Sequence, residues 1–195
     1  IARPAVYGGK VKTFDASAGM KVPGVIKVLQ IGASPVPSEF QPLGGVAVVA
    51  KNTWAAIKGR DALKIEWDDG PNASYDSIAY RKELEAASLK PGKVVRNTGN
   101  LEEAMDSADT VLEASYYLPH LAQAPMEPMV AIARFKDGVC EAWGPSQAPQ
   151  VTRTRIGERL GIPFDNVKVN VTLLGGGFGR KSKPDFIIEA AILAK

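Results

Sequence analysis

The residues best suited to unusual chemistry lie in the stretch TLLGGGFGRKS, Thr172 to Ser182, where four glycines surround one phenylalanine. Glycine tolerates left-handed backbone and lets a ligand approach the main chain closely. A glycine loop between a strand and a helix commonly presents bare peptide N–H groups to an anion. A tight turn without a ligand is the simpler alternative.

Two standard phosphate-binding motifs do not match this loop. A P-loop needs glycine directly before its Lys-Ser pair, but here Arg180 precedes Lys181. The dinucleotide motif G-x-G-x-x-G starts at Gly175 and Gly177 and then meets Arg180 where its third glycine belongs. We therefore expect the loop to approach some other ligand.

Two further segments place polar side chains beside prolines at the ends of expected strands. They are QAPMEP (Gln123 to Pro128) and PSQAPQ (Pro145 to Gln150). Proline fixes its own φ and holds the preceding residue extended, so these segments are stiff. Glu127 or Gln147 taken singly reads as a surface residue. Three stiff loops next to consecutive elements instead suggest one shared site.

Hydrophobic periodicity predicts an α+β fold, in which short strands alternate with short helices. We expect strands at residues 22–31, 44–50, 64–67, 110–118, 130–135, 138–144 and 167–174. Helices are expected at 53–63, 77–87, from 100, at 151–160 and after 182. The expected helix caps are Asn52 or Thr53, Asn100, and Ser182 with Asp185, and Gly161 is expected to end the fourth helix.

Composition excludes several classes of protein. Among 195 residues, 45% are hydrophobic and the net charge is only +3, with no dense basic stripe for nucleic acid. Arg153, Arg155 and Arg159 have the spacing of one solvated helix face. A single cysteine, Cys140, and a single histidine, His120, exclude an internal disulfide and a cysteine- or histidine-built metal site. No apolar run is long enough to predict a membrane span.

Both ends of the sequence look cut from a longer protein. The chain starts IARPAVYGG without Met or a targeting signal, and it stops at EAAILAK within an expected helix.

Taken in order, these motifs resemble those of molybdenum-binding large subunits of the xanthine dehydrogenase and aldehyde oxidase family. The branch most similar is the isoquinoline 1-oxidoreductase beta-subunit type, also known as bacterial molybdenum aldehyde dehydrogenases. The resemblance covers nearly the whole chain and rests on PGV, VAVVAKNTWAA, WDDGPNA, APMEPM, SQAPQ, LGIP and TLLGGGFGR. It implies an α/β-hammerhead domain at 1–75, a helical linker at 76–109, and a truncated N-terminal part of the molybdopterin-binding domain at 110–195.

The resemblance also implies a cofactor and the residues that hold it. The cofactor is molybdenum-molybdopterin, in bacterial relatives usually the cytosine dinucleotide form. In similar proteins the Gln of SQAP hydrogen-bonds the metal's oxo group, and the Phe of GGGFG points its backbone N–H towards the metal's ligands. The matching cofactor-binding residues are Gln147, Gly176, Gly177, Phe178, Gly179 and Arg180. No side chain is expected to ligate the metal directly.

Other roles follow from the same resemblance. The family's general-base Glu lies further downstream, so no catalytic residue is expected in this segment, and Glu127 receives only a supporting role. Arg180 and Lys181 are candidates to pair with an anionic group or are solvated charges. Gln123 stands where many relatives carry His, and His120 is expected to be structural.

The implied function is that of a molybdenum oxidoreductase, which hydroxylates aldehydes or N-heteroaromatics with water-derived oxygen. The implied partners are the rest of the molybdenum subunit and a small subunit with 2Fe-2S clusters, and the bacterial periplasm is favoured over the cytoplasm. Two alternatives stay open. The segment alone could be a non-catalytic docking or assembly module, or it could bind nucleotide phosphates through Gly175 to Lys181.

Overall fold

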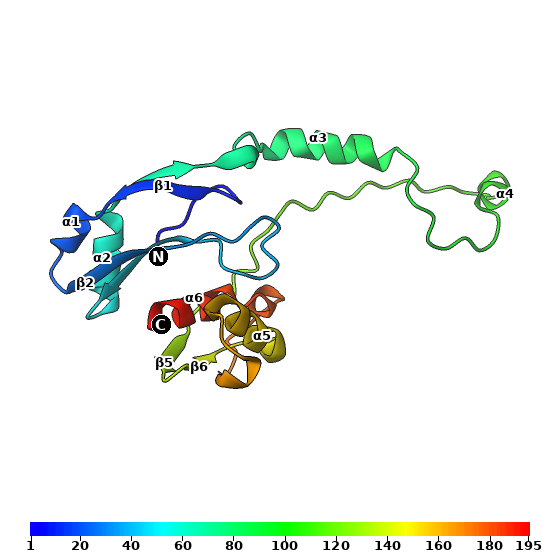
Figure 1. The fold of residues 1–195 in the computed structure, drawn as a ribbon. Helices are drawn as coiled ribbons and strands as arrows, with labels where there is room; N and C mark the ends of the chain where they lie inside the picture. Colours follow the sequence, from blue (N-terminus) through cyan, green and yellow to red (C-terminus); the bar gives the residue numbers. More distant parts are fainter. The chain divides into compact units, whose positions relative to one another are not determined.

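The computed structural model describes all residues 1–195 and contains both helices and strands, as an α+β fold requires. The chain divides into two compact units. The first comprises residues 1–73 together with 123–195, and the second comprises residues 74–122 (Figure 1). None of the helices combines the length and the apolar character that crossing a membrane would require.

The N-terminal part of the first unit consists of two antiparallel strand pairs. β1 (Lys10–Asp15) pairs with β4 (Lys64–Asp68), and β2 (Val25–Ile31) pairs with β3 (Gly45–Ala50). The sequence predicted β2, β3 and β4 but missed β1. A register shift between Val11 and Thr13 breaks the two-residue alternation that would have revealed this strand.

Two helices accompany these strands, α1 (Ser17–Met20) and α2 (Thr53–Asp61). α2 starts where predicted because the Asn52 side chain accepts a hydrogen bond from the N–H of Ala55 at 2.9 Å. The assignment of residues 1–75 as an α/β-hammerhead domain stays a prediction.

The C-terminal part of the first unit contains a three-stranded mixed sheet in the order β5-β6-β7. β5 (Ile132–Lys136) and β6 (Val139–Gly144) form the predicted antiparallel hairpin. Its turn residues Asp137 and Gly138 have φ values of 50° and 78°. β7 (Val167–Val171) runs parallel to β6 and ends three residues earlier than predicted.

A helical crossover makes the parallel pairing of β6 and β7 possible. α5 (Pro149–Leu160) connects them, followed by the short 3-10 helix η2 (Phe164–Asn166). α5 stops at Gly161, whose φ of 63° is the left-handed conformation that ends many helices, so this predicted boundary is confirmed.

α6 (Asp185–Ala194) packs on this sheet and on α5. The core that α6 forms with the sheet and α5 consists of Cys140, Ala142, Ile156, Leu160, Val167, Phe186, Ile187, Ile188 and Ala191. The predicted cap at Ser182 is wrong. Ser182 belongs to a 3-10 turn, η3 (Arg180–Ser182), and α6 begins after Pro184 without a side-chain cap.

The second unit contains α3 (Ser77–Ser88) and α4 (Leu101–Asp106), at the predicted places. Asp76 caps α3, and Asn100 caps α4 by accepting from the N–H of Glu103 at 3.3 Å. The predicted strand at 110–118 does not form. Its β-branched and aromatic residues suit a strand, but no other segment hydrogen-bonds to it.

Candidate functional site

The topology of the β5-β6-β7 sheet brings the three predicted loops to one edge. β6 and β7 are parallel neighbours, with Gly144 opposite Val171, so the loops after both strands leave from the same edge. β5 runs the other way and starts beside the end of β6, with Ile132 opposite Trp143. The segment that precedes β5 therefore joins the other two loops. The expectation that these loops meet is confirmed.

The glycine loop takes a backbone path that ordinary residues rarely adopt. Gly176, Phe178 and Gly179 have φ values of 92°, 52° and 85°. For Phe178 this conformation is strained, and such strain concentrates at functional sites. Phe178 is 73% exposed, so packing into a core does not explain the strain.

Along this path two carbonyl groups have hydrogen-bond partners, whereas three N–H groups have none. The carbonyls of Gly177 and Gly179 accept from the N–H groups of Arg180 and Ser182, at 2.9 and 3.1 Å. The N–H groups of Gly176, Gly177 and Phe178 have no hydrogen-bond partner in the protein. Successive free N–H groups of this kind form a concave donor set for an anionic or oxo group.

Gln147 lies directly against the glycine loop. Its Oε1 accepts a hydrogen bond from the N–H of Gly179 at 3.1 Å, and its own N–H donates to the carbonyl of Lys181 at 3.0 Å. A Cβ on Gly177 would lie 2.4 Å from this Oε1, so only glycine admits the amide here. The Nε2 of Gln147 has no protein partner and adds two N–H donors to the set.

Buried hydroxyls hold the turn that carries Gln147. Ser146 Oγ accepts from the N–H of Ala148 at 3.1 Å and lies 3.0 Å from Thr152 Oγ1 in α5. Both Ser146 and Thr152 are buried. Sequence reasoning missed this pair, although a serine two residues before an alanine at a helix start is a recognisable turn signal.

Glu127 forms two hydrogen bonds with Gly175 at the start of the glycine loop, one as acceptor and one as donor. Its Oε2 accepts from the N–H of Gly175 at 3.0 Å, while its own N–H donates to the carbonyl of Gly175 at 3.0 Å. The same carboxylate forms an ion pair with Lys181, whose side chain is completely buried. The Lys181 ammonium, and secondarily the Gly175 N–H, hold the pKa of Glu127 below its usual value.

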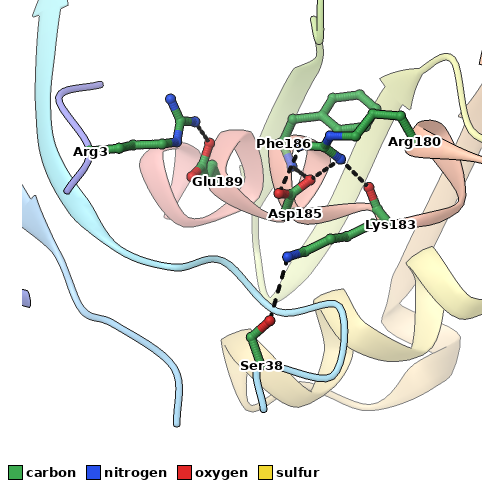
Figure 2. Close-up of polar contacts among 7 residues, drawn as sticks. All are labelled: Arg3, Ser38, Arg180, Lys183, Asp185, Phe186 and Glu189. Carbon is green, nitrogen blue, oxygen red and sulfur yellow. Dashed lines mark hydrogen bonds and ion pairs between the residues drawn. The ribbon is translucent and has the colours of Figure 1, made fainter. Parts of the chain in front are cut away.

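The Arg180 side chain is occupied by protein partners. Its guanidinium forms two hydrogen bonds to the carboxylate of Asp185, at 2.9 and 3.0 Å, and a third to the carbonyl of Lys183 at 3.2 Å. Figure 2 shows this cluster at the start of α6. Arg180 therefore fixes the loop to the helix through protein partners.

Two contacts near this cluster reach the N-terminal part of the same unit (Figure 2). Lys183 Nζ lies 3.5 Å from Ser38 Oγ, and Arg3 forms an ion pair with the buried Glu189 of α6. Burial raises the pKa of Glu189, and the positive charge of Arg3 partly opposes that shift.

The remaining sequence candidates lie elsewhere or have no partner. His120 contacts Tyr75 in the second unit, with its Nδ1 3.4 Å from the phenol oxygen. Gln123 is exposed and makes no side-chain hydrogen bond. No group of three His, Cys, Asp or Glu side chains is arranged to hold a metal ion. The site consists of N–H and amide donors, which can hold an oxyanion or a metal-oxo group in a fixed orientation.

Comparison with known proteins decides the family. Residues 87–195 match the molybdopterin cofactor-binding domain family. This chain belongs to that family. The resemblance drawn from the motifs is thereby confirmed.

Similar proteins within this group are large oxidoreductase subunits. The chain is 32% identical to the membrane-bound aldehyde dehydrogenase (pyrroloquinoline-quinone) of Gluconacetobacter polyoxogenes, covering 98% of the chain and 25% of that protein. It is 29% identical to isoquinoline 1-oxidoreductase subunit beta of Brevundimonas diminuta, covering 97% of the chain and 24% of that protein. The chain thus spans about a quarter of the length of these curated relatives.

A solved structure shows the same fold. The aldehyde oxidoreductase of Desulfovibrio gigas superimposes with a TM-score of 0.65 at 19% identity, covering 97% of this chain and 25% of that one.

The residues of the glycine loop fit the family's cofactor. The absence of a Cβ at Gly177 lets the Gln147 side chain lie against the loop, and the unpartnered N–H groups of Gly176, Gly177 and Phe178 are donors suited to an oxo-bearing metal centre. The free Nε2 of Gln147 approaches the same loop from a separate segment.

Proposed function

We propose that this chain is part of the molybdenum subunit of an oxidoreductase that hydroxylates aldehydes or N-heteroaromatic compounds with oxygen from water. One observation carries the proposal: the Gln147 side chain is hydrogen-bonded to the GGGFG loop, so its free amide N–H groups lie beside a loop whose own peptide N–H groups have no protein partner. The family match and the oxidoreductase names of the relatives support it.

In this proposal Gln147, Gly176, Gly177, Phe178 and Gly179 hold the cofactor. Their N–H groups orient it and stabilise negative charge that develops during turnover. When bound, molybdenum-molybdopterin in its cytosine dinucleotide form supplies two-electron oxidation chemistry. Arg180 acts indirectly, because its contacts with Asp185 and Lys183 fix the end of the loop.

The proposal includes parts beyond this chain. The general base and the remaining cofactor contacts belong to the rest of the molybdenum subunit. In this proposal electrons pass to 2Fe-2S clusters in a partner subunit, and the one cysteine here, Cys140, is buried in the core. Residues 1–75 form the α/β-hammerhead domain of the same subunit.

The structure disfavours phosphate binding through Gly175 to Lys181. Both cations of that segment have protein partners, Arg180 with Asp185 and Lys181 with Glu127. A nucleotide would have to break an internal ion pair to recruit either one.

The test is Gln147→Ala in the complete enzyme. Loss of one preorganised donor should lower kcat roughly a hundredfold while molybdenum and pterin content per subunit changes little. Gln150→Ala is the matched control, because this exposed glutamine in α5 makes no side-chain hydrogen bond. Kinetics of the Gln147 variant equal to the control would refute the role.

A further inference from the structure

Lys181 has an environment that the proposed function does not explain. Lysine is almost never fully buried unless it is paired, yet the Lys181 side chain has no exposed surface. Its ammonium contacts Glu127, whose side chain keeps 28% of its surface exposed. Because an unpaired buried ammonium is strongly unfavourable, the ion pair with Glu127 is what allows Lys181 to be buried.

The backbone of Lys181 supports the other donor segment. Its carbonyl accepts the N–H of Gln147 at 3.0 Å. A single residue therefore contacts Glu127 through its ammonium and the SQAP turn through its main chain. Since Glu127 also binds both the N–H and the carbonyl of Gly175, these contacts form one continuous connection around the donor set.

The close approach of Glu127 requires a glycine at position 175. A Cβ on Gly175 would lie 2.6 Å from the Cβ of Glu127. The first glycine of the loop thus admits the Glu127 side chain, as Gly177 admits the amide of Gln147. Both glycines are needed for the approach of a specific polar side chain.

We propose that Glu127 and Lys181 are positioning residues that hold the glycine loop and the Gln147 turn in register, so that their N–H groups converge on the cofactor. This inference rests on the proposed function and extends it to the residues behind the donors. Neither side chain touches the cofactor in this arrangement. Both act through Gly175 and Gln147.

The charge arrangement allows a rescue design. Glu127→Gln keeps an oxygen that can accept from Gly175 but leaves the Lys181 ammonium buried without its counter-charge. Lys181→Met removes the ammonium and frees the Glu127 carboxylate. The double variant Glu127→Gln/Lys181→Met keeps the acceptor and contains no unpaired buried charge.

The experiment compares these three variants with the parent as complete, cofactor-loaded enzyme. Measurements are molybdenum and pterin content, thermal midpoint, the spectrum of the paramagnetic molybdenum centre, and kcat and KM separately. We expect each single variant to shift the spectrum and lower kcat roughly ten- to a hundredfold with KM within about twofold. The double variant should recover most of the parent's spectrum and most of its kcat.

Two controls isolate positioning from stability. Lys168→Met removes the exposed lysine of an ion pair between β7 and Glu141 of β6 in the same sheet and should leave the spectrum unchanged. Ile156→Val weakens the core, whose buried members include none of the loop residues, and should lower the thermal midpoint without changing the spectrum. If Lys181→Met does not fold, Glu127→Gln and the double variant still decide the question.

Two results would overturn the inference. The first is that Glu127→Gln has the same spectrum and kcat as the parent. The second is that Glu127→Gln changes the spectrum and kcat no more than Ile156→Val does. Gln147→Ala measured alongside separates the two proposals. An altered spectrum for Gln147→Ala with unchanged Glu127 and Lys181 variants refutes the positioning pair alone, whereas absence of bound pterin in the parent refutes the proposed function.

Discussion

Phe178 contributes its main chain rather than its side chain to the candidate site. Its φ of 52° costs about 1–2 kcal/mol for a residue with a Cβ, and its ring is mostly exposed. The strain turns its N–H and those of Gly176 and Gly177 away from protein partners. The glycines beside it keep the remaining loop free of strain and admit Glu127 and Gln147.

Gly177→Ala tests whether the candidate site depends on the close approach of the Gln147 amide to the loop. The new Cβ would lie 2.4 Å from Gln147 Oε1, and the φ of Gly177 is one that alanine accepts. The amide should move aside, so kcat should fall at least about tenfold while the free energy of unfolding changes by less than about 1 kcal/mol. Kinetics and urea unfolding check both expectations.

Gly92→Ala is the matched control, since nothing lies within 4 Å of its added Cβ. Unchanged turnover for Gly177→Ala would show that the amide position is unimportant.

Glu127 should make stability depend on acid. Its folded pKa lies below the usual 4.5, so the folded state holds fewer protons than the unfolded state. Its contribution to stability is complete above about pH 4.5 and is lost as the pH falls through the lower folded value. Unfolding by urea from about pH 7 to about pH 3 should show the parent losing its advantage over Glu127→Gln in acid.

Glu83→Gln, on the exposed surface of α3, serves as the comparison for this effect. A parent and a Glu127→Gln variant that lose stability in parallel would contradict the assignment.

At the scale of elements, α6 fixes the end of β6 from which the Gln147 turn leaves. Ile187 is fully buried, and an added Cβ on Gly144 would lie 3.0 Å from its side chain. The glycine that ends β6 therefore lets the helix close onto the strand. This contact, with the α5 crossover, holds the three loops at one edge of the sheet.

Ile187→Ala should lower the free energy of unfolding by about 2–5 kcal/mol, because it leaves a cavity at the centre of this contact. Leu193→Ala, at a position of the same helix that is 36% exposed, should cost clearly less. Chemical denaturation of both variants checks the difference. Equal losses would place the anchoring contact elsewhere on α6.

At the scale of the whole molecule, the two units differ in the hydrogen bonding of their peptide N–H groups. β6 in the first unit is hydrogen-bonded on both sides, whereas no peptide N–H from Asp109 to Ala122 in the second unit has a partner. Large apolar side chains of the same segment are exposed, among them Leu112 at 94% and Tyr116 at 90%. In the 195-residue chain, amides of 109–122 should exchange at least about a thousandfold faster than those of β6.

Hydrogen exchange read by mass spectrometry measures both segments in one experiment. Protection of 109–122 equal to that of β6 would mean that this segment pairs after all. The sequence of the segment suits a strand, so a complete subunit that supplies a pairing edge should slow its exchange.

The local sequence alone determined much of the secondary structure and the identity of the candidate site. Asn52, Asn100 and Gly161 act at helix ends through contacts with residues a few positions away, so their effect is readable from sequence. The motifs around Gln147 and Phe178 likewise identified the family and predicted that separate loops would meet.

Only the tertiary structure decided which charged groups support the site. Arg180 and Lys181 are adjacent and equally basic, yet the first binds Asp185 on α6 and the second is buried against Glu127, 54 residues away. The strand expected at 110–118 failed for the same kind of reason, because a strand needs an edge that its own residues cannot supply. A partner distant in sequence decides the burial of Lys181, and the lack of one leaves residues 110–118 without a strand, since charge pairing and strand pairing are energies of contact between segments that only folding brings together.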